Sequence, residues 1–217
     1  MAEAVLTRPT ETFSVRVAIK AAVNTLATFV VFPVFVLYRL VAVLAPGRVD
    51  RIFQGYSQLM SLWPGITGDF LRRAFYRLTL RRCSANCTIG FGTVFATPEV
   101  ELGEGVYIGW YGNIGHVSIG DHTLLGSNVT ILSGKRQHHF DRLDIPIRHQ
   151  GGTYTQVDIA DDVWIGNGAI VMEAVARQAV VAAGAVVTTA VAERAIVGGN
   201  PARVIGQRGS AAPSVST

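Results

Sequence analysis

The sequence is poor in cysteine, proline and charge. Its 217 residues include only two cysteines, Cys83 and Cys87, which excludes a disulfide framework, and their spacing matches no common zinc pattern. Reduced thiols in a cytosol-like compartment are therefore expected. Proline occurs 8 times against 23 glycines, and charged residues make up 16% against 49% hydrophobic. This composition is typical of one compact domain with an apolar appendage.

The positive charge is modest and local. The formal net charge is +4 and the pI is near 9.4, but the basic residues cluster in short stretches and no RNA- or DNA-binding motif accompanies them. We therefore expect no nucleic acid partner. A membrane surface is the partner that the basic clusters favour.

An apolar run at residues 21–45 is long enough to span a bilayer. It carries no charge until Arg39, contains Pro33 near its middle, and has basic residues on both sides. Three interpretations stay open on sequence alone. The run is a single span, a re-entrant hairpin with both basic ends on the cytoplasmic side, or a buried helix of a soluble domain.

A second segment, residues 69–82, combines apolar positions at helical spacing with arginines around them. This pattern predicts a helix in the lipid headgroup layer, where guanidinium groups meet lipid phosphates. The alternative is a solvated helix that packs on the next domain. The apolar positions are Phe70, Leu71, Ala74, Phe75 and Leu78, and the arginines are Arg72, Arg73, Arg77, Arg81 and Arg82.

A period of six residues runs through the rest of the chain. Apolar side chains recur at six-residue steps within five sets of three, and the register breaks only between sets. A half-buried strand has period two and a helix 3.6, so neither explains this spacing. The sets are Cys83, Ile89, Phe95; Leu102, Ile108, Ile114; Ile119, Leu125, Ile131; Ile159, Ile165, Val171; and Val175, Val181, Val187.

A short strand, a glycine-assisted turn and one inward aliphatic side chain per six residues predict a three-sided solenoid. One hexad cannot bury its inward residue alone, so about five coils must stack to form a core. Every register break then falls at the same corner. The longest break is a 27-residue loop, 132–158, and loops of that length usually carry function.

The predicted organisation follows from these patterns. It comprises a helical, apolar and amphipathic N-terminal region at 1–82, a mainly β solenoid at 83–191 containing the loop, a C-terminal segment at 192–209, and a flexible tail at 210–217.

Three strings in the second half carry a family resemblance: IADDVWIGNGAIV at 159–171, VVAAGAVVTTAV at 180–191 and IVGGNPARVIG at 196–206. With them, the stretch 102–205 resembles the left-handed parallel β-helix O-acetyltransferases, the group of galactoside, maltose and polysaccharide acetyltransferases. RIFQGYSQLMSLWPG, LRRAFYRLTLRRC and SGKRQHHFDRLDIPIRHQGG, within 50–152, look like the exopolysaccharide-linked branch, whose members carry a similar apolar N-terminal region.

The resemblance implies an acetyl-CoA-dependent O-acetyltransferase that forms a homotrimer, with cofactor grooves between neighbouring β-helices. It implies a sugar or glycolipid acceptor and no required metal. Thr189 stands where many relatives have lysine, which removes one phosphate contact. The residues that the resemblance places along the cofactor groove, the last two in the C-terminal segment, are Trp164, Ala183, Gly184, Thr188, Pro201 and Arg203.

Acyl transfer to a sugar hydroxyl needs a base at the hydroxyl and donors for the oxyanion. Histidine suits the base, and the loop carries QHHFD at 137–141. Relatives carry their base in the matching part of the loop, so the register points to His138, with His139 as the second candidate. A carboxylate, Asp141 or Asp144, would orient the ring, although both also fit exposed loop positions. Asn113 is a further candidate for contact with acceptor or oxyanion, and Asp141 is also a candidate for contact with the acceptor.

Two other functions remain at this point. The first is a γ-class carbonic anhydrase, which shares the β-helix and needs three zinc-binding histidines. The candidates are His116, His122 and His138, but their spacing along the chain does not fit the turns of that family. In addition, glycines before His116 and His122 favour structural turn positions for these two residues. A non-catalytic membrane β-helix scaffold is the other, but it needs no histidine-bearing loop. Because acetyl-CoA is cytosolic and arginines flank the apolar run, we expect the cytoplasmic face of the inner (plasma) membrane.

Overall fold

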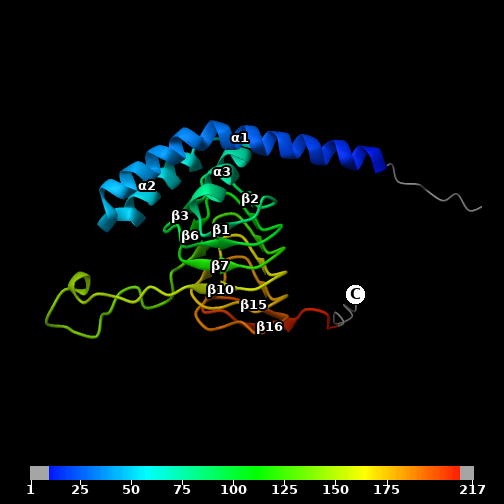
Figure 1. Ribbon diagram of the computed structural model, residues 1–217. Coiled ribbons are helices and arrows are strands. Elements are labelled where there is room, and N and C mark those ends of the chain that lie inside the picture. The colour runs from blue at the N-terminus through cyan, green and yellow to red at the C-terminus, as the bar shows by residue number, and fades with distance from the viewer. Residues whose placement is uncertain (1–9, 211–217) are drawn as a thin grey trace, which may run out of the picture.

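The computed structural model describes the chain from residue 10 to 210, with side chains from residue 17 onward. Nearly all of the predicted flexible tail, residues 211–217, lies outside the described residues. A helical layer covers one end of a β-helix (Figure 1). This layer consists of α1 (Thr10–Leu44), the short 3-10 helix η1 (Pro46–Arg48), α2 (Val49–Ser61) and α3 (Gly65–Thr79).

The β-helix has three parallel faces, which we call A, B and C in chain order. Face A contains β1 (Arg82–Cys83), β4 (Glu101–Leu102), β7 (Val117–Ile119) and β10 (Val157–Ile159). Face B contains β2 (Thr88–Ile89), β5 (Tyr107–Ile108), β8 (Leu124–Leu125), β11 (Trp164–Ile165), β13 (Val180–Val181), β15 (Ala195–Gly198) and β16 (Arg203–Gln207). Face C contains β3 (Val94–Phe95), β6 (Asn113–Ile114), β9 (Thr130–Ile131), β12 (Ile170–Val171) and β14 (Val186–Val187).

The pairing confirms the predicted solenoid and adds one turn to it. Parallel bridges carry face A beyond β10 through Val175 to Val191, and β15 extends face B. The β-helix therefore has about six turns rather than five, and it continues into the segment that begins at residue 192. β16 then turns back and pairs antiparallel with β15, which covers the last edge of face B.

The hexad register explains the core. The last residue of almost every strand points inward, so that Ile108, Leu125 and Ile165 stack in register along face B with no exposed surface. Each coil buries its aliphatic side chains only because the next coil covers them. All register breaks fall at the corner between faces C and A, as the spacing predicts.

Glycine at the corner between faces B and C lets adjacent coils approach closely. A Cβ atom added to Gly109 would lie 2.6 Å from the backbone nitrogen of Ser127 and 2.7 Å from the carbonyl carbon of Gly126. These contacts are with backbone, which cannot rotate away. The glycine after the inward residue is therefore required by coil stacking.

We predict that Gly109→Ala destabilises the protein by about 1–3 kcal/mol, the usual range for overpacking a close contact. Gly55→Ala is the matched control, because a Cβ atom there meets nothing within 4 Å and alanine favours the interior of α2 by up to about 1 kcal/mol. Denaturant unfolding followed by circular dichroism measures both changes. Equal stabilities of the two variants would contradict the stacking explanation.

Helix α3 packs on the first coil. The side chain of Arg72 is fully buried, and its Nε donates to the carbonyl oxygen of Ile89 at 2.7 Å while the guanidinium also reaches Trp63 and Asp69. Arg73 donates to the carbonyl oxygen of Cys87 at 3.1 Å and to Asn24 Oδ1 at 2.6 Å.

The prediction that Arg72 and Arg73 meet lipid phosphates is therefore wrong. Both guanidinium groups are turned inward, where they bind carbonyl groups at the first coil, and burial lowers the pKa of each. The structure instead agrees with the alternative prediction for residues 69–82, a helix that packs on the next domain. Arg77, Arg81 and Arg82 remain exposed.

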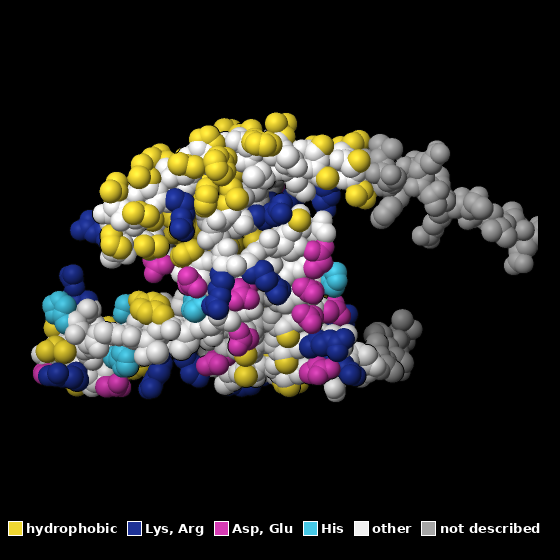
Figure 2. Space-filling view, in the orientation of Figure 1, with side chains coloured by type: hydrophobic (Ala, Val, Ile, Leu, Met, Phe, Trp, Pro, Cys, Tyr) yellow, Lys and Arg dark blue, Asp and Glu magenta, His cyan; other side chains and the backbone are white. Residues whose placement is uncertain are grey.

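Helix α1 leaves a large apolar surface uncovered. Its stretch Val17–Leu44 is long and apolar enough to cross a membrane, and its most apolar 18-residue window has a mean hydropathy of 2.2, yet only 22% of that window is buried. Ala27, Val31 and Tyr38 are buried where α1 lies against α2 and α3. Figure 2 shows hydrophobic side chains gathered over this layer, whereas the β-helix below it carries most of the charge.

The path of the chain separates the three interpretations of the apolar run. α1 is one continuous helix through Pro33, so the chain does not reverse there; the reversal comes at η1. The helix lies across the end of the β-helix (Figure 1), and most of its length is not the buried core of a domain. A span along the membrane normal would draw α2 and α3, which contact α1, into the bilayer.

Candidate active site

The long loop leaves the β-helix after β9 and returns at β10, at the corner between faces C and A. Three backbone hydrogen bonds join its two arms near the root, each from an amide to a carbonyl oxygen. The donor and acceptor residues are Thr155 and Ser133 at 3.0 Å, Thr153 and Arg136 at 2.8 Å, and His139 and Gly151 at 3.0 Å. The loop therefore has a hydrogen-bonded stem before it projects sideways from the coils (Figure 1).

Both candidate bases lie on this stem. The side chain of His138 is exposed. His139 is half-buried, and its Nε2 lies 3.3 Å from the hydroxyl of Thr153 on the opposite arm. Of these two histidines, only His138 has a ring without a hydrogen-bond partner among the described residues.

The two loop carboxylates do not orient either ring. Asp144 pairs with Arg142, whose Nε donates to Oδ1 at 3.0 Å and whose second nitrogen binds Oδ2. Hydrogen bonding from this guanidinium lowers the pKa of Asp144. Asp141 is exposed. Both residues are therefore exposed loop carboxylates rather than groups that orient a histidine ring.

His116 lies directly beneath the loop root. Its backbone amide donates to the hydroxyl of Ser133 at 2.9 Å, and its carbonyl accepts from the amide of Val157 at 3.0 Å. Its Nε2 atom is buried and has no hydrogen-bond partner among the described residues. A buried polar nitrogen without a partner is unusual in proteins.

A cavity of about 510 Å³ opens beside His116; we call it the corner cavity. Its wall is contributed by α2, the corners of the first coils and the loop stem, and most of the side chains in it are polar. Gln137, in the wall, directly precedes His138. The lining residues are Asp50, Gln54, Ala96, Thr97, Glu99, His116, Ser133, Gln137 and Tyr154.

Sequence patterns missed most of this cavity. The hexad register contains one available signal: His116 lies two residues after the inward Ile114, and Ser133 two residues after the inward Ile131, so the two share a corner in neighbouring coils. No such signal exists for Asp50 and Gln54, because the position of α2 over the corner is a matter of tertiary packing.

The residues expected at the cofactor lie on the later coils. Trp164 is 55% exposed on face B, and Ala183 and Gly184 occupy an exposed turn between faces B and C. Thr188 and Arg203 line a second cavity of about 350 Å³ near the last coil, and Pro201 is exposed nearby in sequence. Thr188 and Arg203 thus line one cavity within a single chain. Asn113 is exposed on face C.

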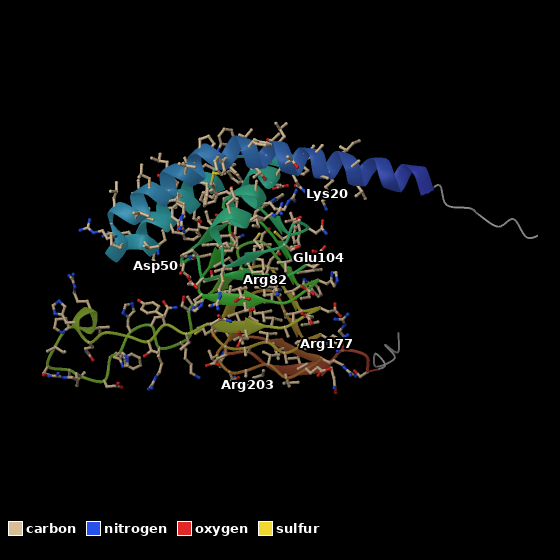
Figure 3. All side chains as sticks on the ribbon, viewed as in Figure 1. Lys20, Asp50, Arg82, Glu104, Arg177 and Arg203 are labelled. Carbon is tan, nitrogen blue, oxygen red and sulfur yellow. The ribbon has the colours of Figure 1, made fainter. Side chains whose placement is uncertain are left out.

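The corner cavity and the expected cofactor residues are far apart within one chain. Asp50, at the start of α2, belongs to the helical layer, whereas Arg203 lies toward the opposite end of the β-helix (Figure 3). His122 lies at the corner between faces A and B, away from His116. Among residues 17–210, no cluster of three metal-ligating side chains occurs.

Solved structures similar in fold to this chain include hexapeptide-repeat acetyltransferases. A maltose O-acetyltransferase from Clostridium difficile 630 is 22% identical, with a TM-score of 0.63 over 73% of this chain and 88% of its own. A hexapeptide-repeat acetyltransferase from Vibrio cholerae, complexed with acetyl-CoA, is 22% identical, with a TM-score of 0.64 over 75% and 89%. A galactoside acetyltransferase in complex with coenzyme A is 21% identical, with a TM-score of 0.64 over 73% and 80%.

These likenesses establish the fold. No family model matches the sequence, and no curated protein matches it.

Proposed function

We propose that this protein is an acetyl-CoA-dependent O-acetyltransferase that acts on a sugar hydroxyl of a surface polysaccharide or its lipid-linked precursor. The observation that carries the proposal is the fold match over three quarters of the chain to an acetyltransferase complexed with acetyl-CoA. The histidine-bearing loop and the motifs of the last coils support it independently.

The proposed reaction is a direct transfer. The hydroxyl oxygen of the acceptor attacks the thioester carbonyl while an imidazole, that of His138, takes the hydroxyl proton. The tetrahedral intermediate collapses, the ester forms, and coenzyme A leaves as a thiol after protonation. The turn at Ala183 and Gly184 holds the pantetheine arm, with the backbone amide of Ala183 as donor because that of Gly184 already donates to Asn167, and Arg203 binds phosphate oxygens.

The full chain in neutral detergent tests the proposal. Acetyl-CoA binding is measured by calorimetry, and release of free thiol is followed with a panel of hexoses and hexose-containing oligosaccharides. Binding, together with thiol release that depends on the sugar, is the expected result. A chain that binds no acetyl-CoA would refute the proposal.

The active unit is a homotrimer in this proposal, because a single chain does not bring the loop histidines and the cofactor residues together. Light scattering in detergent measures its mass. A fully active monomer would contradict the trimer.

We predict that Arg203→Ala raises the Km for acetyl-CoA roughly tenfold or more with little change in kcat, because a guanidinium–phosphate contact contributes about 1.5–3 kcal/mol to binding. Arg194→Ala is the matched control, since this exposed arginine pairs only with its neighbour Glu193. Steady-state kinetics separates the two constants. A loss of kcat at saturating acetyl-CoA would move Arg203 from cofactor binding to the chemical step.

The proposed location is the cytoplasmic face of the inner membrane, with α1 lying in the membrane surface. Exposed apolar side chains of α1 such as Phe29 and Leu40 support this, as do the exposed arginines Arg39, Arg48 and Arg51 around them. A bilayer interface removes apolar area from water and attracts basic side chains.

We predict that Phe29→Glu with Leu40→Glu releases most of the protein from membranes. The two side chains are 72% and 53% exposed, so the change weakens lipid contact without disturbing a core. Leu143→Glu, at a loop residue that is 99% exposed, is the control and leaves the distribution unchanged. Membrane fractionation reads out both variants, and retention of the double variant in the membrane fraction would place the anchor elsewhere.

A further inference from the structure

Three neighbouring hollows surround the first turns of α2. The corner cavity shares Asp50 with a hollow of about 400 Å³ at the turn between α1 and α2, which we call the turn hollow. The turn hollow shares Arg51 with a groove of about 430 Å³ between α1 and α2, which we call the helix groove. Each hollow shares one lining residue with the next, which places the three side by side between the β-helix corner and the apolar layer.

The corner cavity, at one end of this row, suits a polyhydroxyl group. Its donors and acceptors are held in place: Gln54 donates from Nε2 to the carbonyl of Ala96 at 2.9 Å, and Asp50 accepts from the hydroxyl of Thr97 at 3.0 Å. The buried Nε2 of His116 has no partner among the described residues. That atom has almost no accessible surface, so the hydroxyl groups of a sugar would instead bind the polar side chains that line the cavity, such as Glu99 and Gln137.

The turn hollow, in the middle of the row, suits an anion. Arg48 and Arg51 contribute to its wall and both are exposed. Neither forms an ion pair with a carboxylate among residues 17–210. The two guanidinium groups outnumber the one carboxylate in the wall, that of Asp50, and they favour a phosphate, which they bind through paired N–H donors.

The helix groove, at the far end, suits a hydrocarbon chain. Leu37, Val41, Ile52 and Leu59 contribute to its wall, and Leu37 and Leu59 are exposed large hydrophobic side chains. The groove belongs to the apolar layer that Figure 2 shows over the helices. An alkyl chain there would continue directly into lipid if the layer lies in a membrane surface.

We infer that these hollows bind one amphiphilic acceptor, a sugar joined through phosphate to a long lipid chain. The sugar occupies the corner cavity beside Gln137, the residue before His138 on the loop stem, the phosphate lies between Arg48 and Arg51, and the chain lies in the helix groove. The inference rests on the proposed function and narrows its acceptor to the lipid-linked form. The membrane then presents the sugar to the loop without release into water.

Binding of three probes to the full chain in neutral detergent tests the inference. The first is a hexose joined by a phosphodiester to a long alkyl chain, the second is the hexose 1-phosphate without the chain, and the third is the alkyl phosphate without the sugar. Calorimetry is expected to give the lowest Kd for the first probe, by at least tenfold over each of the others. Equal Kd values for the first probe and either fragment would overturn the inference.

Variants assign each part of the probe to its hollow. Arg48→Gln with Arg51→Gln is expected to weaken the complete probe by roughly fivefold to tenfold per arginine, whereas Arg77→Gln, an exposed arginine of α3 away from these hollows, has no effect. His116→Leu is expected to weaken the complete probe but not the alkyl phosphate. Equal losses for the double variant and Arg77→Gln would show general attraction to charge and would also overturn the inference.

The test is separate from that of the proposed function. Probe binding is measured without acetyl-CoA, so a chain that binds the complete probe but transfers no acetyl group refutes the enzyme proposal alone. A chain that acetylates free hexose but binds the complete probe no better than the fragments refutes the lipid-linked acceptor alone. Circular dichroism melting of each variant confirms that the substituted surface residues leave the fold intact.

Discussion

His138→Ala is expected to lower kcat by roughly a hundredfold to ten-thousandfold, the usual cost of removing a general base. The affinity for acetyl-CoA should change little, because the residues assigned to the cofactor lie on the later coils, away from the loop stem. The loss is therefore one of transition-state stabilisation rather than of ground-state binding. Single-turnover rates and calorimetry on the same preparation separate these two quantities.

His139→Ala is the matched control. The ring of His139 lies 3.3 Å from the Thr153 hydroxyl across the stem, so its removal should loosen the loop and reduce the rate modestly. If His139→Ala abolishes turnover while His138→Ala does not, the base is His139 and the mechanism stands. Near-normal rates in both variants and in the double variant would refute a histidine base and favour a non-catalytic scaffold.

Arg72→Leu is expected to destabilise the protein by about 3 kcal/mol or more. The substitution leaves the carbonyl groups of Ile89 and Trp63 without their buried donor and Asp69 without its cation, and each such loss costs about 1–3 kcal/mol. Because these contacts join α3 to the first coil, the helical layer should loosen before the later coils do. Denaturant unfolding gives the size of the loss, and amide hydrogen exchange of α3 shows where it occurs.

Arg77→Leu is the control on the same helix, where the side chain is exposed and a surface substitution usually changes stability by less than about 0.5 kcal/mol. Arg72→Lys should recover only part of the loss, because an ammonium group cannot reproduce the planar fork of a guanidinium. Equal, small effects at Arg72 and Arg77 would contradict the structural role assigned to Arg72.

Only part of the corner cavity could be predicted from the sequence. The loop, which carries Gln137 and His138, could be predicted because it interrupts the regular six-residue register. His116 looked like a turn residue, since a glycine before a histidine says nothing about what covers the side chain. Only the stacking of coils puts it under Ser133, and only the helical layer brings Asp50 and Gln54 across the corner.

The arginines of α3 show that a charge pattern in the sequence likewise does not reveal what a side chain contacts. Helical spacing of Phe70, Phe75 and Leu78 correctly indicates a helix with an apolar side. Spacing does not say what the arginines face, because a guanidinium buried against carbonyl groups and one exposed to lipid phosphate occupy the same positions in a helix. The difference depends on the free carbonyls that the first coil offers, a feature of the neighbouring structure.

The sequence by itself determined the solenoid, its three faces and the corner that carries the loop. The reason is that coil stacking is local and has the same requirements every six residues. Each repeat needs an inward aliphatic side chain and, at tight corners such as Gly109, a residue without Cβ. Tertiary structure decided the rest. The flat course of α1 across the end of the coils, the inward turn of Arg72 and Arg73, and the cavity beside His116 all depend on contacts between segments far apart in the chain. No period in the sequence encodes such contacts, since each is made once.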